Sequence, residues 1–177
     1  MMSKLRRCWD ADSCFGYLSN QGDHQQECAR VLTSAEEGNC EIVVSALALA
    51  EVLYLKGDGS TKLFKESRDK IREFFRRSCF VVVDVDRFVA EQAQELFWTH
   101  NGPNGLMPKD AVHLATALQT NSTYLETFDG CLLGLSSKVG GNPALLVQRP
   151  GHDLVTPLTG GVEPDGQMRF DATQNDE

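Results

Sequence analysis

The sequence has no apolar run long enough to cross a membrane, and its basic N-terminus reaches Asp10 before an apolar segment can form. Its six cysteines include no C-x-x-C pair, and only four histidines accompany them, without ligand-like spacing. This pattern argues against a zinc site and indicates thiols that stay reduced. We therefore expect a soluble cytoplasmic protein with no membrane segment.

The 177 residues, 41% of them hydrophobic, suffice for one hydrophobic core and are too few for two. We expect one domain over residues 1–149 and a polar, acidic tail over residues 150–177. The net charge of −8 argues at first against a nucleic-acid partner. However, six acids and one arginine in the tail account for −5 of it, which leaves −3 for the domain. If four acids of the domain bind metal, its remaining surface is close to neutral.

Short apolar stretches of strand length alternate with helical patterns. The strand-like stretches lie near residues 6–11, 41–47, 79–85, 122–128 and 143–148, and the first is the weakest. Helical spacing of apolar residues follows Asp86 and Pro108 and extends along residues 60–78. The alternation predicts an α/β fold with a mostly parallel sheet covered on both faces. In such sheets, ligands bind at the carboxyl ends of the strands.

Glu51 stands on the apolar face of a predicted helix. Nine uncharged residues precede it, and its neighbours on that face include Leu47 and Leu55. A buried carboxylate without a partner becomes neutral, so we expect a cation or hydrogen-bond donors nearby. The alternative is a solvated glutamate at the edge of the helix.

Three aspartates stand at strand ends or in the first turn of a helix. Asp10 closes the first strand, Asp110 follows Pro108, and Asp129 follows the fourth strand. If each aspartate is considered alone, the helix dipole explains why Asp110 stands in a first turn, and a role as N-cap explains the position of Asp129. In a parallel sheet, however, these points and Glu51 lie at one edge.

Four carboxylates at one edge repel each other unless a divalent cation neutralises them, and Mg²⁺ and Mn²⁺ prefer oxygen ligands. We therefore predict a metal site for phosphate chemistry. Lys109, beside Asp110, is the candidate contact to a phosphate of the substrate, and Thr127 offers a hydroxyl beside Asp129.

The same stretches resemble the PIN-domain nucleases over about residues 6–149. Four stretches resemble the acidic motifs of the family: CWDADSCFGYL, VVSALALAEVLY, GLMPKDAVHLATAL and YLETFDGCLLGL. The most specific of these matches is GLMPKDAVHLATAL. The stretch ALLVQRP is similar to the last strand of the family. The resemblance implies a PIN-like three-layer α/β/α fold with a central, mostly parallel five-stranded sheet.

The resemblance also assigns roles to individual residues. It implies that Asp10, Glu51 and Asp110 are the primary metal ligands, Asp129 is the fourth acid, and Thr127 is a supporting hydroxyl. Asp12 departs from the family, which more often has asparagine there, and is either an extra acceptor beside the metal or the N-cap of the first helix. We interpret His113 as a packed helix residue, because the family commonly has a histidine there without a catalytic role.

The function that the resemblance implies is a Mg²⁺- or Mn²⁺-dependent endoribonuclease. Such enzymes cleave single-stranded RNA and leave 5′-phosphate and 3′-hydroxyl ends. Many are toxins of VapBC-type toxin–antitoxin pairs, silenced by a small antitoxin protein, and others process RNA without one. The resemblance also implies a homodimer formed through helical faces.

Two other functions remain open. Asp10-Ala11-Asp12 also resembles the nucleophile motif of aspartate-nucleophile phosphatases, although the strand before it is weakly apolar. A non-catalytic PIN-like module that binds RNA or protein is the other alternative, and the presence of all four acids argues against it. The eight basic residues between Lys56 and Arg77 are either a track for the phosphate backbone or an ordinary solvated helix face.

Overall fold

Five strands form one fully parallel sheet in the order β3-β2-β1-β4-β5. The computed structural model describes residues 4–20, 22–53, 55, 61–100 and 105–154, without the side chains of residues 61–65. The strands are β1 Leu5–Trp9, β2 Cys40–Ser45, β3 Phe80–Val83, β4 Tyr124–Glu126 and β5 Leu146–Gln148. Each overlaps one of the five predicted stretches, so the α/β class with a parallel sheet is confirmed.

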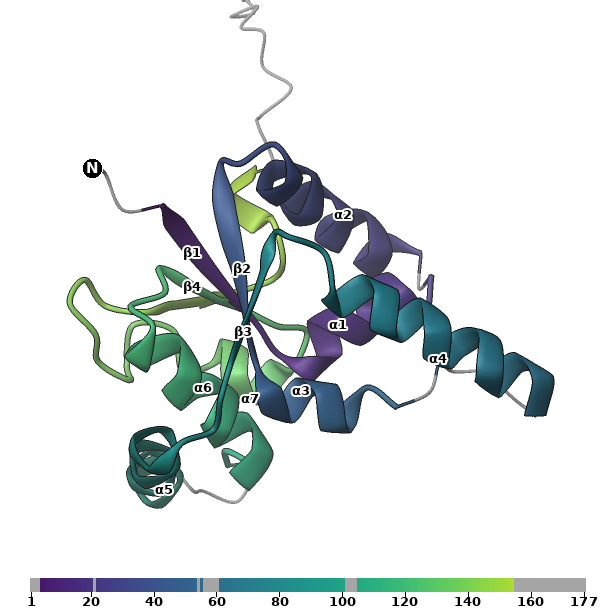
Figure 1. The fold of residues 1–177 in the computed structure, drawn as a ribbon. Helices are drawn as coiled ribbons and strands as arrows, with labels where there is room; N and C mark the ends of the chain where they lie inside the picture. Colours follow the sequence, from purple (N-terminus) through teal and green to yellow (C-terminus); the bar gives the residue numbers. More distant parts are fainter. Residues whose placement is uncertain (1–3, 21, 54, 56–60, 101–104, 155–177) are drawn as a thin grey trace, which may run out of the picture.

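Helices cover both faces of the sheet, which gives the three layers that the sequence predicts (Figure 1). One face carries α1 Ala11–Leu18, α2 Asp23–Glu36, α4 Thr61–Phe75 and the short 3-10 helix η1 His152–Leu154, and the other carries α5 Arg87–His100, α6 Pro108–Gln119 and α7 Gly130–Leu133. The short helix α3 Ala46–Glu51 continues directly from β2. In the described part of the chain, no helix has both the length and the apolar character needed to cross a membrane.

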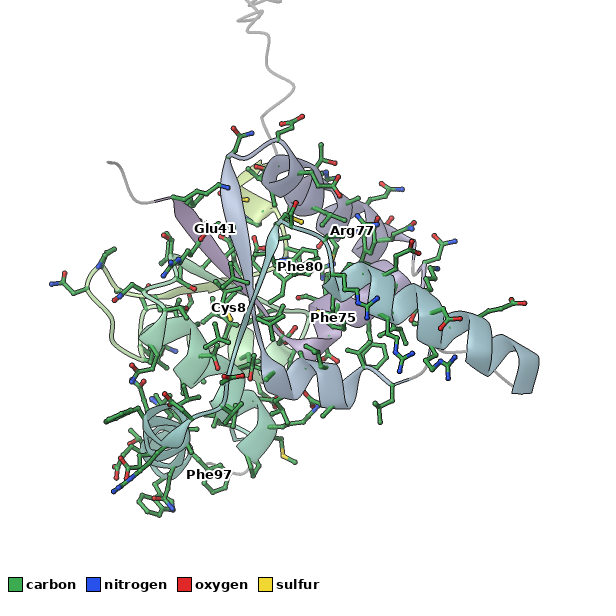
Figure 2. The ribbon with its side chains drawn as sticks, in the orientation of Figure 1. Cys8, Glu41, Phe75, Arg77, Phe80 and Phe97 are labelled. Atoms are coloured by element: carbon green, nitrogen blue, oxygen red, sulfur yellow. The ribbon has the colours of Figure 1, made fainter. Side chains whose placement is uncertain are left out.

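Side chains of the central strands alternate between two hydrophobic cores. In β2, Ile42 and Val44 face the α1/α2/α4 layer, whereas Val43 faces the α5/α6 layer. Phe75 at the end of α4 meets Phe80 of β3 in the first core, with ring centroids 6.1 Å apart (Figure 2). Burial on both faces explains why these strands read as continuous apolar runs.

The order of the strands reverses between β1 and β4. From β1 the chain builds β2 and β3 on one side, and then it crosses to build β4 and β5 on the other. Trp9 at the end of β1 pairs in register with Glu126 at the end of β4, so the two carboxyl ends lie side by side. Such a reversal point is where open α/β sheets bind their ligands.

A buried ion-pair network lies between the sheet and the last described residues. The guanidinium of Arg7 donates to Glu126 Oε1 at 2.6 Å and also pairs with Asp153. Glu126 accepts further hydrogen bonds from Trp9 Nε1 at 2.8 Å and from the backbone of Gly151 at 3.0 Å. These contacts, called the Arg7 network below, include residues beyond the domain boundary predicted after residue 149.

Candidate active site

Asp10 stands where β1 ends and α1 begins. Its Oδ1 accepts a hydrogen bond of 2.8 Å from the backbone of Ser13 and caps α1, and its Oδ2 accepts one from the hydroxyl of Thr127. The carboxyl is almost fully buried. Burial raises the pKa of Asp10 to about 6, although both hydrogen bonds favour its ionised form. The predicted N-cap at Asp12 is wrong, because the helix starts two residues earlier and Asp12 lies in its exposed first turn.

Thr127 links Asp10 to Asp129. Its hydroxyl oxygen accepts a hydrogen bond of 2.9 Å from the backbone of Asp129 while it donates to Asp10. The carboxylate of Asp129 caps α7 through the backbone N–H groups of Cys131 and Leu132, at 2.7 and 2.9 Å. The N-cap that the sequence offers as one explanation of Asp129 is therefore present. Oδ1 makes both capping bonds, which leaves Oδ2 for another partner.

Glu51 is the last residue of α3, and α6 supplies both of its side-chain partners. His113 Nε2 lies 2.7 Å from Glu51 Oε2, and Lys109 Nζ lies 3.4 Å from Glu51 Oε1. Burial raises the pKa of Glu51, but the hydrogen bond from His113 and the ammonium of Lys109 outweigh it, so the pKa lies below its usual value. The sequence predicts a cation or hydrogen-bond donors near this glutamate, and Lys109 and His113 of α6 supply both.

Asp110 joins the two halves of the site. Its Oδ1 lies 4.0 Å from Lys109 Nζ, so this lysine lies between two of the four acids. Burial raises the pKa of Asp110; the charge of Lys109 opposes the rise, and the negative charge of Asp129 adds to it. The switch point of the sheet thus gathers Asp10 and Asp129 through Thr127, and Glu51 and Asp110 through Lys109.

The donor set of this site suits a hard divalent cation. All four side chains offer carboxylate oxygens, the ligands that Mg²⁺ and Mn²⁺ take. The ammonium of Lys109 already stands as a cation between two of them. As the side chains stand, no group of three acids, histidines or cysteines among the described residues is close enough to hold a metal ion.

Comparison with known proteins identifies the fold family. The sequence pattern of the PIN domain family matches residues 11–132, which is more than half of the chain. The chain belongs to the PIN domain family. PIN domains are nucleases, and the acidic edge at the switch point is the part of this PIN domain that suits such chemistry.

Solved structures with the same fold come from bacterial toxin–antitoxin systems. VapBC2 of Rickettsia felis, bound to a DNA fragment from its promoter, is 17% identical with a TM-score of 0.58 over 82% of this chain and 98% of its own. VapC20 of Mycobacterium tuberculosis, a toxin that cleaves the sarcin–ricin loop, is 15% identical with a TM-score of 0.53 over 70% and 90%. DNA-bound VapBC of Salmonella typhimurium is 17% identical with a TM-score of 0.55 over 82% and 98%. These likenesses show the fold alone, and no curated protein matches the sequence.

His113 is the site residue that the sequence interpretation missed. It is buried as expected of a packed helix residue, but it also holds a carboxylate of the site. Its spacing of i, i+4 from Lys109 on α6 was the available signal, because both residues then face the same way. Of the predicted basic track, Lys56 and the side chains of Lys62 and Lys65 lie outside the described residues.

Phe128, between Thr127 and Asp129, anchors the loop that carries both. Its ring stacks on His24 of α2 with centroids 3.9 Å apart, and the guanidinium of Arg149 lies 5.1 Å from its centroid. Gly16 of α1 makes room for the ring, because a Cβ there would lie 2.7 Å from Phe128 Cε2 and 3.3 Å from His24 Cβ. The close approach of α1 thus positions two site residues through Phe128.

Gly16→Ala is expected to displace Phe128 and with it Thr127 and Asp129. Overpacking of this kind costs about 1–3 kcal/mol, and the better helix propensity of alanine offsets about 1 kcal/mol of it. We therefore expect nuclease activity to fall about 10-fold or more, with only a small loss of stability. Urea denaturation and nuclease rates measure the two effects.

Gly130→Ala is the matched control for that change. Gly130 adjoins Asp129, but a Cβ there meets no described atom within 4 Å. The control should keep wild-type stability and activity. Equal activity of both alanine variants would show that the close approach of Gly16 to Phe128 has no bearing on the site.

Proposed function

We propose that this PIN domain is a Mg²⁺- or Mn²⁺-dependent endoribonuclease that hydrolyses single-stranded RNA and leaves 5′-phosphate and 3′-hydroxyl ends. The observation that carries the proposal is that two linked pairs of acids, Asp10 with Asp129 and Glu51 with Asp110, lie near the carboxyl ends of the strands, where the charge of Asp129 raises the pKa of Asp110. The family match supports the nuclease class. A similar structure, described as a toxin that cleaves the sarcin–ricin loop, supports RNA as the substrate.

The residues of the site take distinct roles in this proposal. Asp10, Glu51, Asp110 and Asp129 would hold the cation. Thr127 keeps Asp10 oriented through its hydroxyl, and Lys109 would contact a phosphate of the RNA. When bound, a divalent cation lowers the pKa of a water molecule and stabilises the charge that develops on the phosphate oxygens.

The environment of Asp10 favours a metal ligand over a phosphatase nucleophile. Both of its oxygens accept hydrogen bonds, and the group is almost fully buried at the end of β1. A nucleophile has to be free to approach phosphorus, whereas a metal ligand can keep one hydrogen bond on each oxygen and offer a second lone pair to the cation. A non-catalytic module would gain stability by losing the buried carboxylates, which makes their presence an argument for function.

We further propose an antitoxin protein and a second copy of the chain as partners. Similar structures of VapBC and other toxin–antitoxin complexes support the antitoxin. The exposed aromatic side chains of Phe88 and Trp98, both on α5, support a protein contact at that helix. Large exposed apolar side chains are typical of interfaces.

Incubation with end-labelled single-stranded RNA tests the proposal. We expect cleavage in Mn²⁺ or Mg²⁺, complete loss of it in EDTA, and recovery when the metal is returned in excess. The 5′-phosphate at the new end should support ligation to an adapter. Metal-independent cleavage, or no cleavage of any of several structured and unstructured RNAs, would contradict the assignment.

A further inference from the structure

We propose that Lys109 is a built-in counter-ion of the acidic site, which a divalent cation displaces from Glu51 and Asp110 while His113 keeps Glu51 in position. The inference rests on the proposed metal-dependent function and adds two positioning residues to it. Both come from one face of α6 and hold the same carboxylate, but they should affect metal binding in opposite directions.

Lys109 is held loosely enough to leave. Its Nζ lies 3.4 Å from Glu51 Oε1 and 4.0 Å from Asp110 Oδ1, at the long end of the range for ion pairs. The side chain is 53% exposed, so its flexible stem can move into solvent without opening the core. The ammonium neutralises part of the repulsion between the two carboxylates. A divalent cation among the same oxygens supplies that neutralisation with twice the charge.

His113 cannot leave in the same way. Its side chain is 1% exposed, and α6 packs around it with buried residues before and after it, Ala111 and Leu114. Nε2 donates to the carboxylate of Glu51 at 2.7 Å, because an ionised carboxylate only accepts. The other ring nitrogen, Nδ1, is buried and has no hydrogen-bond partner among the described residues. The tautomer with its proton on Nε2 therefore leaves no N–H group unpaired.

Glu51 needs such support because of its place at the end of α3. The negative end of a helix dipole disfavours a carboxylate, and the helix ends at this residue. His113 takes Oε2 and leaves Oε1 facing Lys109, so Oε1 is the oxygen that a cation would share. Residues that hydrogen-bond to a metal ligand in this way orient the ligand without contacting the metal.

The two contacts predict opposite changes in metal affinity. Lys109→Met removes a competitor and should raise the affinity for Mn²⁺ about 2- to 5-fold, the upper part of the range that corresponds to exposed ion pairs. The same change should lower RNA cleavage, because methionine has no ammonium group to contact a phosphate of the RNA. His113→Leu should weaken Mn²⁺ binding about 10- to 100-fold, as removal of a ligand's supporting partner does. His113→Gln keeps an N–H donor near the place of Nε2 and should recover much of that loss.

Mn²⁺ binding to the full chain without RNA tests the inference. The electron paramagnetic resonance signal of free Mn²⁺ reports the affinity of wild type, Lys109→Met, His113→Leu and His113→Gln at one ionic strength, and circular dichroism reports folding. Lys4→Met is the matched control, because the change in net charge is the same. Lys4 is exposed and precedes β1, so it lies at the amino end of that strand, whereas the site lies at the carboxyl end. We expect no more than about a twofold change in the control.

The outcomes separate this inference from the proposed function. Tighter binding in Lys109→Met together with weaker binding in His113→Leu, restored in part in His113→Gln, supports it. If wild type binds Mn²⁺ and Lys109→Met binds it equally or more weakly, Lys109 is not a counter-ion that the metal displaces, and the nuclease assignment still stands. If wild type neither binds Mn²⁺ nor cleaves RNA, both the inference and the proposed function are overturned.

Discussion

Asp10→Asn is expected to lower RNA cleavage by about 10³-fold or more and to leave the protein folded. The change removes a charged ligand from the site. It keeps the shape of the side chain, and the amide oxygen still caps α1 through Ser13, since asparagine is as good an N-cap as aspartate. The amide N–H can donate to the hydroxyl oxygen of Thr127, so the contact to β4 persists.

The same variant has an expected effect on stability that depends on pH. Burial raises the pKa of Asp10 to about 6 in the folded protein, above its value in the unfolded chain. The folded protein therefore binds this proton more tightly, and its free energy of unfolding falls as pH rises from about 4 to about 6. The loss is of the order of 2–3 kcal/mol in protein without metal, at 1.36 kcal/mol for each pH unit of the window. Asp10→Asn lacks this carboxyl and should escape the loss.

Urea denaturation in EDTA at pH 4 and pH 7 measures that difference. The two proteins should have similar stability at pH 4, and the variant should be the more stable at pH 7. Asp23→Asn, an exposed acid in the first turn of α2, serves as the control and should keep both wild-type activity and wild-type pH dependence. If Asp10→Asn loses activity and stability together at pH 7, misfolding explains the loss and the ligand role of Asp10 has no support.

The strands and the edge that carries the site could be predicted because local patterns determine them. Most residues of β2 and β3 are apolar, the Ile and Val among them are β-branched, and such runs adopt strands in many environments. Asp10 and Asp129 come just after β1 and β4, and Glu51 and Asp110 lie on helices α3 and α6, so the rule for the carboxyl ends of parallel strands predicted where the acids lie. Helix α2 was missed, although Cys28, Val31, Leu32 and Ala35 recur at helical spacing, because polar residues make up most of its length.

Contacts between distant parts of the chain could not be predicted in the same way. His113 and Glu51 are 62 positions apart, and Arg7 and Glu126 are 119 positions apart. Which of many basic and acidic residues pair depends on the register of the strands and on the packing of α6, and neither is written in a local pattern. The role of Asp10 as N-cap depends on where the helix begins, which is the least certain feature of any sequence pattern.

Arg7→Met is expected to lower the free energy of unfolding by about 3–5 kcal/mol, the largest effect on stability among the changes considered. The side chain of Arg7 is fully buried, and so is that of its partner Glu126. Without the guanidinium, Glu126 keeps neutral donors among the described residues, Trp9 Nε1, the Gly151 backbone and, at 3.5 Å, Gln148 Nε2. Asp153 can turn to solvent because its side chain is partly exposed, but Glu126 cannot.

The neighbouring arginine provides the control. Arg6 lies on the same strand and pairs with Glu41, but both side chains are partly exposed, so Arg6→Met should cost no more than about 1 kcal/mol. Urea denaturation of the two variants, compared with wild type, measures the contrast. Equal costs for Arg7→Met and Arg6→Met would mean that desolvation of the Arg7 network cancels its attraction.

A second variant decides whether the cost comes from the charge left on Glu126. Burial raises the pKa of Glu126 and the charge of Arg7 lowers it, but all its side-chain neighbours donate hydrogen bonds, so we treat the pair as ionic. Glu126→Gln removes the charge and keeps an oxygen for Trp9 and Gly151. The double variant with Arg7→Met should then be more stable than Arg7→Met alone, because no unpaired carboxylate remains in the core. If the double variant is less stable instead, the hydrogen bonds of the Glu126 carboxyl to Trp9 and Gly151 outweigh the cost of its charge, and an unpaired carboxylate does not explain the loss in Arg7→Met.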